Sequence, residues 1–339
     1  MKIGLIDVDG TNFPNLHLMK ISAWHKERGD QVEWYDPLTS VQMDRVYMSK
    51  VFNFTPDYQY PIYADEIIKG GSGYCIETKD GRECFHEERD TWLLPEIEHI
   101  YPDYSLYPEL TKDTAYGFMS RGCPNGCVFC HVGAKEGRKS YKVADLSEFW
   151  RGQKNIVLLD PNPTACPEWR DNLQQLIDSG ANVDFCQGVD IRIMTPEMAE
   201  MILKIKVKTI HFAWDRYPDK SIVVPKLEMF KKLSGWGRDK ISVYILVNFN
   251  TTTEQDIERV QTCRRLGIQP YPMVYNKGEF FYRNGRLRPR GELLKKYTQE
   301  QIDHAVISRD IQRWCNPRVF WQCERFEDYK PGRIQRLEG

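Results

Sequence analysis

The chain has 339 residues, of which 41% are hydrophobic and 28% charged, and its formal net charge is −1. These values are those of an ordinary globular protein with room for one large domain and a smaller one. The N-terminus turns polar after six residues, and no apolar run reaches about 18 residues, so we expect neither a signal peptide nor a membrane partner and place the protein in the cytoplasm. Ten Cys in a chain of this kind favour a reducing compartment over a disulfide framework.

The first 110 residues are expected to form a small Rossmann-like α/β domain. Hydrophobic runs predict an amphipathic helix at 16–28, ending before Gly29, and strands at 2–7, 31–35, 45–52 and 66–71. The second and third of these strands are joined by only some nine residues, too few for a full crossover helix.

Cys123, Cys127 and Cys130 lie in the run Arg-Gly-Cys-Pro-Asn-Gly-Cys-Val-Phe-Cys-His at 121–131. The glycines and the proline of this run allow a tight loop. Three thiolates are one ligand fewer than structural zinc sites and electron-transfer iron-sulfur clusters normally take, whereas catalytic metals keep one position open. The spacing therefore indicates chemistry at an open metal.

The C-x3-C-x2-C spacing, with the aromatic Phe129 before the third Cys, resembles the signature loop of radical S-adenosylmethionine (SAM) enzymes. The resemblance implies that Cys123, Cys127 and Cys130 hold a 4Fe-4S cluster whose fourth iron binds SAM. It also implies an external electron donor such as flavodoxin or ferredoxin, anaerobic conditions, and cleavage of SAM to a 5'-deoxyadenosyl radical. Two alternatives are a zinc site completed by His131, and three unrelated thiols.

Residues 111–276 are expected to form the core, with six β/α steps. Strands are predicted at 116–121, 155–160, 183–187, 208–215, 240–248 and 268–275. Capping boxes at 145–148 and 251–254 are expected to open helices, and further helices are predicted at 167–179, 197–204 and 224–233. Six steps fit the partial (β/α)6 TIM-like barrel that the resemblance implies.

Polar residues follow several of these strands, and barrel enzymes carry function at the carboxyl ends of their strands. By resemblance, the end of the second strand binds the SAM amino group, often through Gly-Gly-Glu. Here that segment reads Leu-Asp-Pro-Asn at 159–162, so Asp160 and Asn162 are the candidates. Asp190, Arg192 and Asn248 are candidates for binding the SAM carboxylate and ribose. Each could instead cap a helix or tie down a loop.

Cys166 follows the second core strand and Cys186 lies at the end of the third. A thiol at the barrel mouth could donate a hydrogen atom to a substrate radical, as in some radical SAM enzymes. The alternative is that each is simply a small apolar residue in the core.

The N-terminal pattern also resembles the cobalamin-binding domain that often precedes a radical SAM core. No Asp-x-His-x-x-Gly motif is present to supply a lower axial His, so a degenerate scaffold is expected. Because some cobalamin-dependent relatives lack that His, bound cobalamin stays an alternative. Only Cys75 and Cys84 precede the core, which favours a single cluster.

Residues 277–339 are expected to be a C-terminal extension with a helix at 299–314 and aromatic residues that pack on the barrel. From residue 276 onward there are 14 Lys and Arg against 9 Asp and Glu. The basic residues of the first part are interleaved with aromatic side chains, a mixture that can hold phosphates and stack on bases; they are Arg283, Arg286, Arg288, Arg290, Lys295 and Lys296. A solvated helix face and loop is the alternative.

The sequence thus predicts a radical SAM enzyme that abstracts hydrogen from an unidentified substrate. The alternatives are a cobalamin-assisted radical SAM methyltransferase, a radical SAM enzyme that modifies a nucleic acid or nucleotide, and a metal-stabilised nucleic-acid-binding module.

Overall fold

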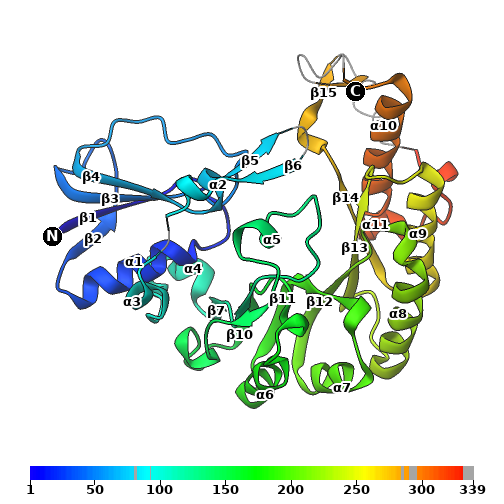
Figure 1. The fold of residues 1–339 in the computed structure, drawn as a ribbon, viewed down its shortest axis with the longest axis horizontal. Coiled ribbons are helices and arrows are strands. Elements are labelled where there is room, and N and C mark those ends of the chain that lie inside the picture. Colours follow the sequence, from blue (N-terminus) through cyan, green and yellow to red (C-terminus); the bar gives the residue numbers. More distant parts are fainter. Residues whose placement is uncertain (80–81, 92, 284–285, 290–295, 331–339) are drawn as a thin grey trace. The chain divides into compact units, whose positions relative to one another are not determined.

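The computed structural model describes residues 1–79, 82–91, 93–283, 286–289 and 296–330 (Figure 1). The chain divides into two compact units, residues 1–184 and the remainder from Phe185. The domain boundaries expected near residues 110 and 276 stay predictions. Among the described residues, no helix has both the length and the hydropathy of a membrane span.

The first unit opens with a four-stranded sheet in the order β2-β1-β3-β4, in which all neighbouring strands are parallel. Its strands are β1 (Lys2–Asp7), β2 (Gln31–Trp34), β3 (Met43–Ser49) and β4 (Ala64–Gly70), close to the predicted ones. Helix α1 (Leu16–Glu27) contacts β1, β2 and β3. It begins where the Asn15 side chain accepts the N–H of Leu18 at 3.3 Å, which satisfies one of the first N–H groups of the helix.

The connection from β2 to β3 contains no helix, as its length predicted, and yet the strands are parallel. The chain must return past β1, a distance of roughly 16 Å for strand spacings of about 4.8 Å and a rise of about 3.3 Å per residue. The nine steps from Trp34 to Met43 reach up to about 30 Å when extended. A crossover without a helix is sufficient here because β2 has only four residues.

The rest of the segment before the Cys loop is made of short elements. These are α2 (Ser72–Cys75), the antiparallel hairpin of β5 (Ile76–Lys79) and β6 (Arg82–Phe85), α3 (Pro95–Glu98) and α4 (Pro108–Thr111).

The largest sheet has six strands whose order follows the sequence, β7-β10-β11-β12-β13-β14. The strands are β7 (Thr114–Gly117), β10 (Asn155–Leu158), β11 (Asn182–Val189), β12 (Lys206–Ala213), β13 (Ile241–Val247) and β14 (Gln269–Val274). The helices between them are α6 (Trp169–Ser179), α7 (Pro196–Lys204), α8 (Lys220–Ser234) and α9 (Thr253–Arg265). The mixed α/β class and the parallel six-stranded sheet are confirmed. Closure of this sheet into a partial barrel stays a prediction.

The strand predicted at 116–121 is broken in two. The carboxylate of Asp160 accepts the backbone N–H of Met119 at 2.8 Å and that of Ser120 at 2.6 Å. These two groups are therefore bonded to a side chain instead of a sheet partner, and β7 ends at Gly117. The chain continues as β8 (Ser120–Arg121), which pairs antiparallel with β9 (Tyr141–Lys142).

The capping box at 145–148 is present, but it opens only a 3₁₀ turn, Leu146–Glu148. Phe149 leaves the helical conformation at φ −135° and packs on Gly117 so closely that a Cβ there would collide with its ring. Gly152 then has φ +97°, which no continuing helix allows. The predicted helix was wrong because packing of Phe149 against β7 overrides the cap.

In the second unit, α9 contacts β13 and β14, and α10 (Gln299–Trp314) contacts β14 and α9. Helix α10 has the predicted bounds and opens with a capping box of Thr298 and Gln301. The box that opens α9 is formed by Thr252 and Gln255, one residue later than predicted. The short hairpin of β15 (Phe280–Arg283) and β16 (Arg286–Pro289) precedes α10, and α11 (Pro317–Phe320) follows it.

Candidate metal centre

The Cys loop leaves β8 at Arg121 and folds back on itself at two glycines. Gly122 has φ +76°, and a Cβ on it would collide with the carbonyl oxygen of Lys139. Gly126 has φ +54° and lies against the guanidinium group of Arg138. Both positions need glycine because an L side chain is strained at such φ values, as the sequence predicted for a tight loop.

Glu136 fastens the two flanks of the Cys loop to each other. One of its carboxylate oxygens lies 3.0 Å from Arg121 Nη1, and the other accepts the N–H of Gly122 at 3.0 Å. The N–H of Cys123 is bonded to the carbonyl oxygen of Gly137 at 3.2 Å. The first cysteine is thus held at the base of the loop by charge-assisted and backbone hydrogen bonds.

The three cysteines lie on one short loop and differ in exposure. Cys123 and Cys127 are half-buried and Cys130 is exposed at the surface, and the N–H of Cys130 is bonded to the carbonyl oxygen of Cys127 at 3.1 Å. Although Cys130 keeps exposed surface, the protein atoms around its thiol displace water and raise its pKa to about 11, and the neighbouring Cys127 and Cys123 add to the shift. Phe129 beside them is half-buried. Within the described ranges, no three His, Cys, Asp or Glu side chains already form a metal-binding group.

The set of donors fits an iron-sulfur cluster, for which thiolates are the preferred protein ligands, and a buried amide beside Cys123 has an acceptor oxygen without a donor. Asn162, after β10, is 2% exposed. Its Nδ2 donates to Cys123 Sγ at 3.5 Å, whereas its Oδ1 has no hydrogen-bond partner. A buried acceptor without a donor is unfavourable by about 1–3 kcal/mol, and an ammonium group placed beside the loop would satisfy it.

Asp160 has a different role from Asn162. Besides the N–H groups of Met119 and Ser120, its carboxylate accepts the Ser120 hydroxyl. Burial raises the pKa of Asp160 to about 7, although these three hydrogen bonds act in the opposite direction. The structure therefore places Asp160 as the residue that turns the chain from β7 into the Cys loop.

Cys166, which was predicted to donate a hydrogen atom to a substrate radical, is 1% exposed. Its thiol donates to Glu168 Oε2 at 3.2 Å. Burial, and then this hydrogen bond, raise the pKa of Cys166 to about 11. The thiol is therefore held as a neutral, hydrogen-bonded group.

In the second unit, Asp190 and Arg192 bind each other at the end of β11. Asp190 Oδ1 accepts two hydrogen bonds from Arg192, one from its backbone N–H at 3.0 Å and one from its side-chain Nε–H at 2.9 Å. Arg192 Nη1 reaches Asp219 at 3.2 Å. Cys186, also on β11, is half-buried, and its carbonyl oxygen accepts the Tyr244 hydroxyl at 3.0 Å.

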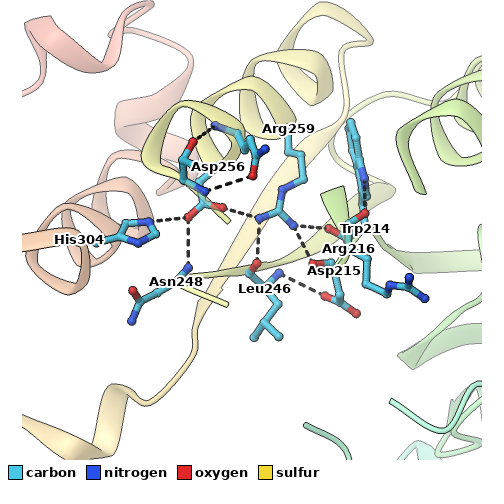
Figure 2. Close-up of polar contacts among 10 residues, drawn as sticks. Trp214, Asp215, Arg216, Leu246, Asn248, Asp256, Arg259 and His304 are labelled. Carbon is cyan, nitrogen blue, oxygen red and sulfur yellow. Dashed lines mark hydrogen bonds and ion pairs between the residues drawn. The ribbon is translucent and has the colours of Figure 1, made fainter. Parts of the chain in front are cut away.

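Asn248, after β13, belongs to the polar network drawn in Figure 2. Its N–H is bonded to Asp256 Oδ2 at 3.1 Å, and its Nδ2 donates to the Tyr275 carbonyl at 3.4 Å. It has φ +65°, a conformation that Asn tolerates better than most residues. Asn248 thus ties down the loop after its strand, which is one of the alternatives to SAM binding given for it, and SAM binding stays a prediction.

The centre of this network is an ion pair on α9 in which Arg259 and Asp256, 2.5 Å apart, have fully buried side chains (Figure 2). Arg259 also donates to the carbonyl oxygens of Trp214 at 2.7 Å and Leu246 at 2.8 Å. Burial acts to raise the pKa of Asp256, but a hydrogen bond from His304 on α10 and the charge of Arg259 outweigh it and lower that pKa. The pair therefore connects α9, α10 and the ends of β12 and β13.

Several of these residues carried no signal in the sequence. Glu136 bonds to residues 14 and 15 positions earlier in the chain. Arg259 bonds to Asp256 on its own helix and to the backbone carbonyl oxygens of Trp214 and Leu246. Of the basic residues near 283–296, Arg290 and Lys295 lie outside the described residues, while Arg288 and Lys296 are exposed. The interpretation of this segment as a nucleic-acid contact stays a prediction.

Comparison with protein-family models gives no match for this chain, and comparison with curated proteins gives none either.

Proposed function

We propose that this protein is a radical SAM enzyme. The observation that carries the proposal is the position of the three-Cys loop directly after the first strand of a six-stranded parallel sheet, with the orphaned Oδ1 of Asn162 beside Cys123. Cys123, Cys127 and Cys130 would hold a 4Fe-4S cluster. With SAM bound, the cluster would supply one-electron cleavage of SAM to a 5'-deoxyadenosyl radical that abstracts hydrogen from a substrate.

The residues of the first unit have distinct roles in this proposal. Asn162 accepts an N–H from the amino group of SAM, which satisfies its Oδ1 and orients the cofactor. Asp160 sets the turn into the loop, and Glu136 fixes the loop flanks through Arg121 and Gly122. All three residues position the Cys loop or the cofactor, which is the contribution that the protein makes in a cofactor enzyme.

The candidates in the second unit enter the proposal as supports. Asp190 and Arg192 are bonded to each other, and Asn248 is bonded to Asp256 and Tyr275. These hydrogen bonds hold the segments that follow β11 and β13 in place. Their binding to SAM stays a prediction from the resemblance.

Metal analysis tests the proposal. The protein is reconstituted without oxygen with iron and sulfide, and wild type is compared with Cys127→Ser. We expect about four irons per wild-type chain, as a 4Fe-4S cluster requires, and little iron in the variant. One zinc per chain with no iron would instead support the metal-stabilised nucleic-acid-binding module.

A further inference from the structure

Helix α5 (Val132–Lys135) follows the third cysteine directly, and Glu83 contacts the residue at its N-terminal end. Glu83, on β6, accepts two hydrogen bonds from His131. The backbone N–H of His131 lies 3.1 Å from Glu83 Oε2, and Nδ1 of its ring lies 2.7 Å from the same oxygen. One carboxylate oxygen is thus fixed against the peptide unit that joins Cys130 to His131.

Lys135, at the other end of α5, also contacts residues that precede the Cys loop. Lys135 Nζ lies 3.3 Å from the Asp90 carboxylate, 3.2 Å from Ser72 Oγ and 3.6 Å from Cys75 Sγ. The Asp90 side chain is only 4% exposed, so this ion pair is shielded from solvent. Held at both ends, α5 gives Glu83 a fixed place beside the last cysteine of the loop.

A carboxylate in this place has a specific consequence for a cluster. The reduction potential of an iron-sulfur cluster depends on nearby charge and on hydrogen bonds to its sulfurs. Glu83 brings a negative charge to the loop, and it also engages the N–H that follows Cys130, which is then not available to a sulfur atom. Both effects favour the oxidised cluster and lower its potential, which makes the reduced cluster a stronger reductant.

Two of the nearby cations have carboxylate partners of their own, and the group bonded to Glu83 itself is the His131 ring. Lys135 is paired with Asp90, and Arg121 with Glu136. Arg138 lies over Gly126, earlier in the loop.

We propose that Glu83 is a positioning residue that sets the potential of the cluster, lowering it through its contact with His131. This inference rests on the proposed function, because it concerns a cluster held by Cys123, Cys127 and Cys130.

Spectroscopic redox titration of the reconstituted protein at pH 8 tests the inference. Glu83→Gln keeps the size of the side chain and removes the charge. Removing a unit charge about 10 Å from a redox centre, at an effective dielectric constant near 20, changes the equilibrium between its oxidised and reduced forms roughly tenfold. We therefore expect a shift to less negative potential of about 59 mV for one electron, which corresponds to a tenfold change.

Three further variants separate charge from structure. Glu83→Asp keeps the charge and should stay near the wild-type potential. His131→Asn keeps Glu83 and the backbone N–H, and it should do the same. Glu87→Gln removes an equal charge from the exposed 3₁₀ turn after β6, and it should leave the potential unchanged.

Two results would overturn the inference while the proposed function stands. One is a Glu83→Gln protein with full iron content and the wild-type potential. The other is a Glu83→Asp protein whose reduction potential rises by about 59 mV, a tenfold change in the equilibrium for one electron. This second result applies even if Glu83→Gln does not load iron. A wild-type protein that binds no iron would overturn the proposed function, and this inference with it.

Discussion

At the scale of single residues, Asn162 is the side chain beside the Cys loop that has an unpartnered hydrogen-bond acceptor. It is buried, it donates to Cys123 Sγ, and its oxygen accepts nothing. Its neighbour Asp160 is fully used in turning the chain. Of the two polar residues predicted at this strand end, Asn162 is therefore the one that keeps an acceptor oxygen without a partner.

Replacing Asn162 by Leu should weaken SAM binding to the reconstituted protein about tenfold to a hundredfold. The reason is the loss of a hydrogen bond to a charged group, which contributes about 1.5–3 kcal/mol. Equilibrium dialysis with labelled SAM measures the effect. Asn172→Leu is the matched control, because Asn172 is also buried with an unpartnered Oδ1 but lies beside Cys166. Equal loss of SAM binding in both variants would contradict the role of Asn162.

Gly122→Ala should reduce iron binding about tenfold or more, a typical effect of disturbing the surroundings of metal ligands. Its Cβ would meet the Lys139 carbonyl at the base of the loop. Gly152→Ala is the control, since Gly152 also has positive φ but no atom lies within 4 Å of the added carbon. Iron content after anaerobic reconstitution is the measurement. Full iron content in Gly122→Ala would show that the close approach at Gly122 is not needed.

At the scale of helices and strands, the Arg259–Asp256 pair joins α9 to the ends of β12 and β13. Arg259→Met leaves the Asp256 carboxylate buried without its partner, which should lower the free energy of unfolding by about 3–5 kcal/mol. Urea unfolding measures this.

Arg265→Met, on the same helix, breaks only an exposed pair with Glu228, so it should have a much smaller effect. Similar losses of stability in Arg259→Met and Arg265→Met would mean that burial of the first pair contributes nothing.

Local signals predicted the elements well wherever the helix cap and the packing agree. Thr195 and Pro196 open α7, and Thr298 opens α10, as their side chains and conformations require. At Asp145 the cap is equally good, but Phe149 packs on β7 and the helix does not form. No pattern near residue 149 reports that contact, because its partner lies more than thirty residues earlier in the chain.

The candidate site was predictable only in part for a similar reason. The spacing of the Cys residues and the positive φ of Gly122 and Gly126 follow from the sequence of the loop itself. Glu83 and Glu136 reach the loop from β6 and from the segment after α5. Their importance depends on where the fold places them, and a single glutamate has no periodicity or spacing that would reveal it.

At the scale of the whole molecule, the order of the strands is the one expected for six successive β/α steps. Six parallel strands run in sequence order, and the Cys loop follows the first of them. The contacts of Glu83 with His131 and of Asp90 with Lys135 link the segment before the core to the Cys loop within the first unit. The leading segment is therefore expected to affect the metal centre and not only to precede it.

The formation of 5'-deoxyadenosine from SAM tests the central claim most directly. The reconstituted protein is incubated without oxygen with SAM and a strong reductant, and the products are analysed by mass spectrometry. The account predicts 5'-deoxyadenosine and methionine from the wild type and none above background from Cys130→Ser. A wild-type protein that carries its full complement of iron and yet leaves SAM intact, or forms equal product with Cys130→Ser, would contradict it.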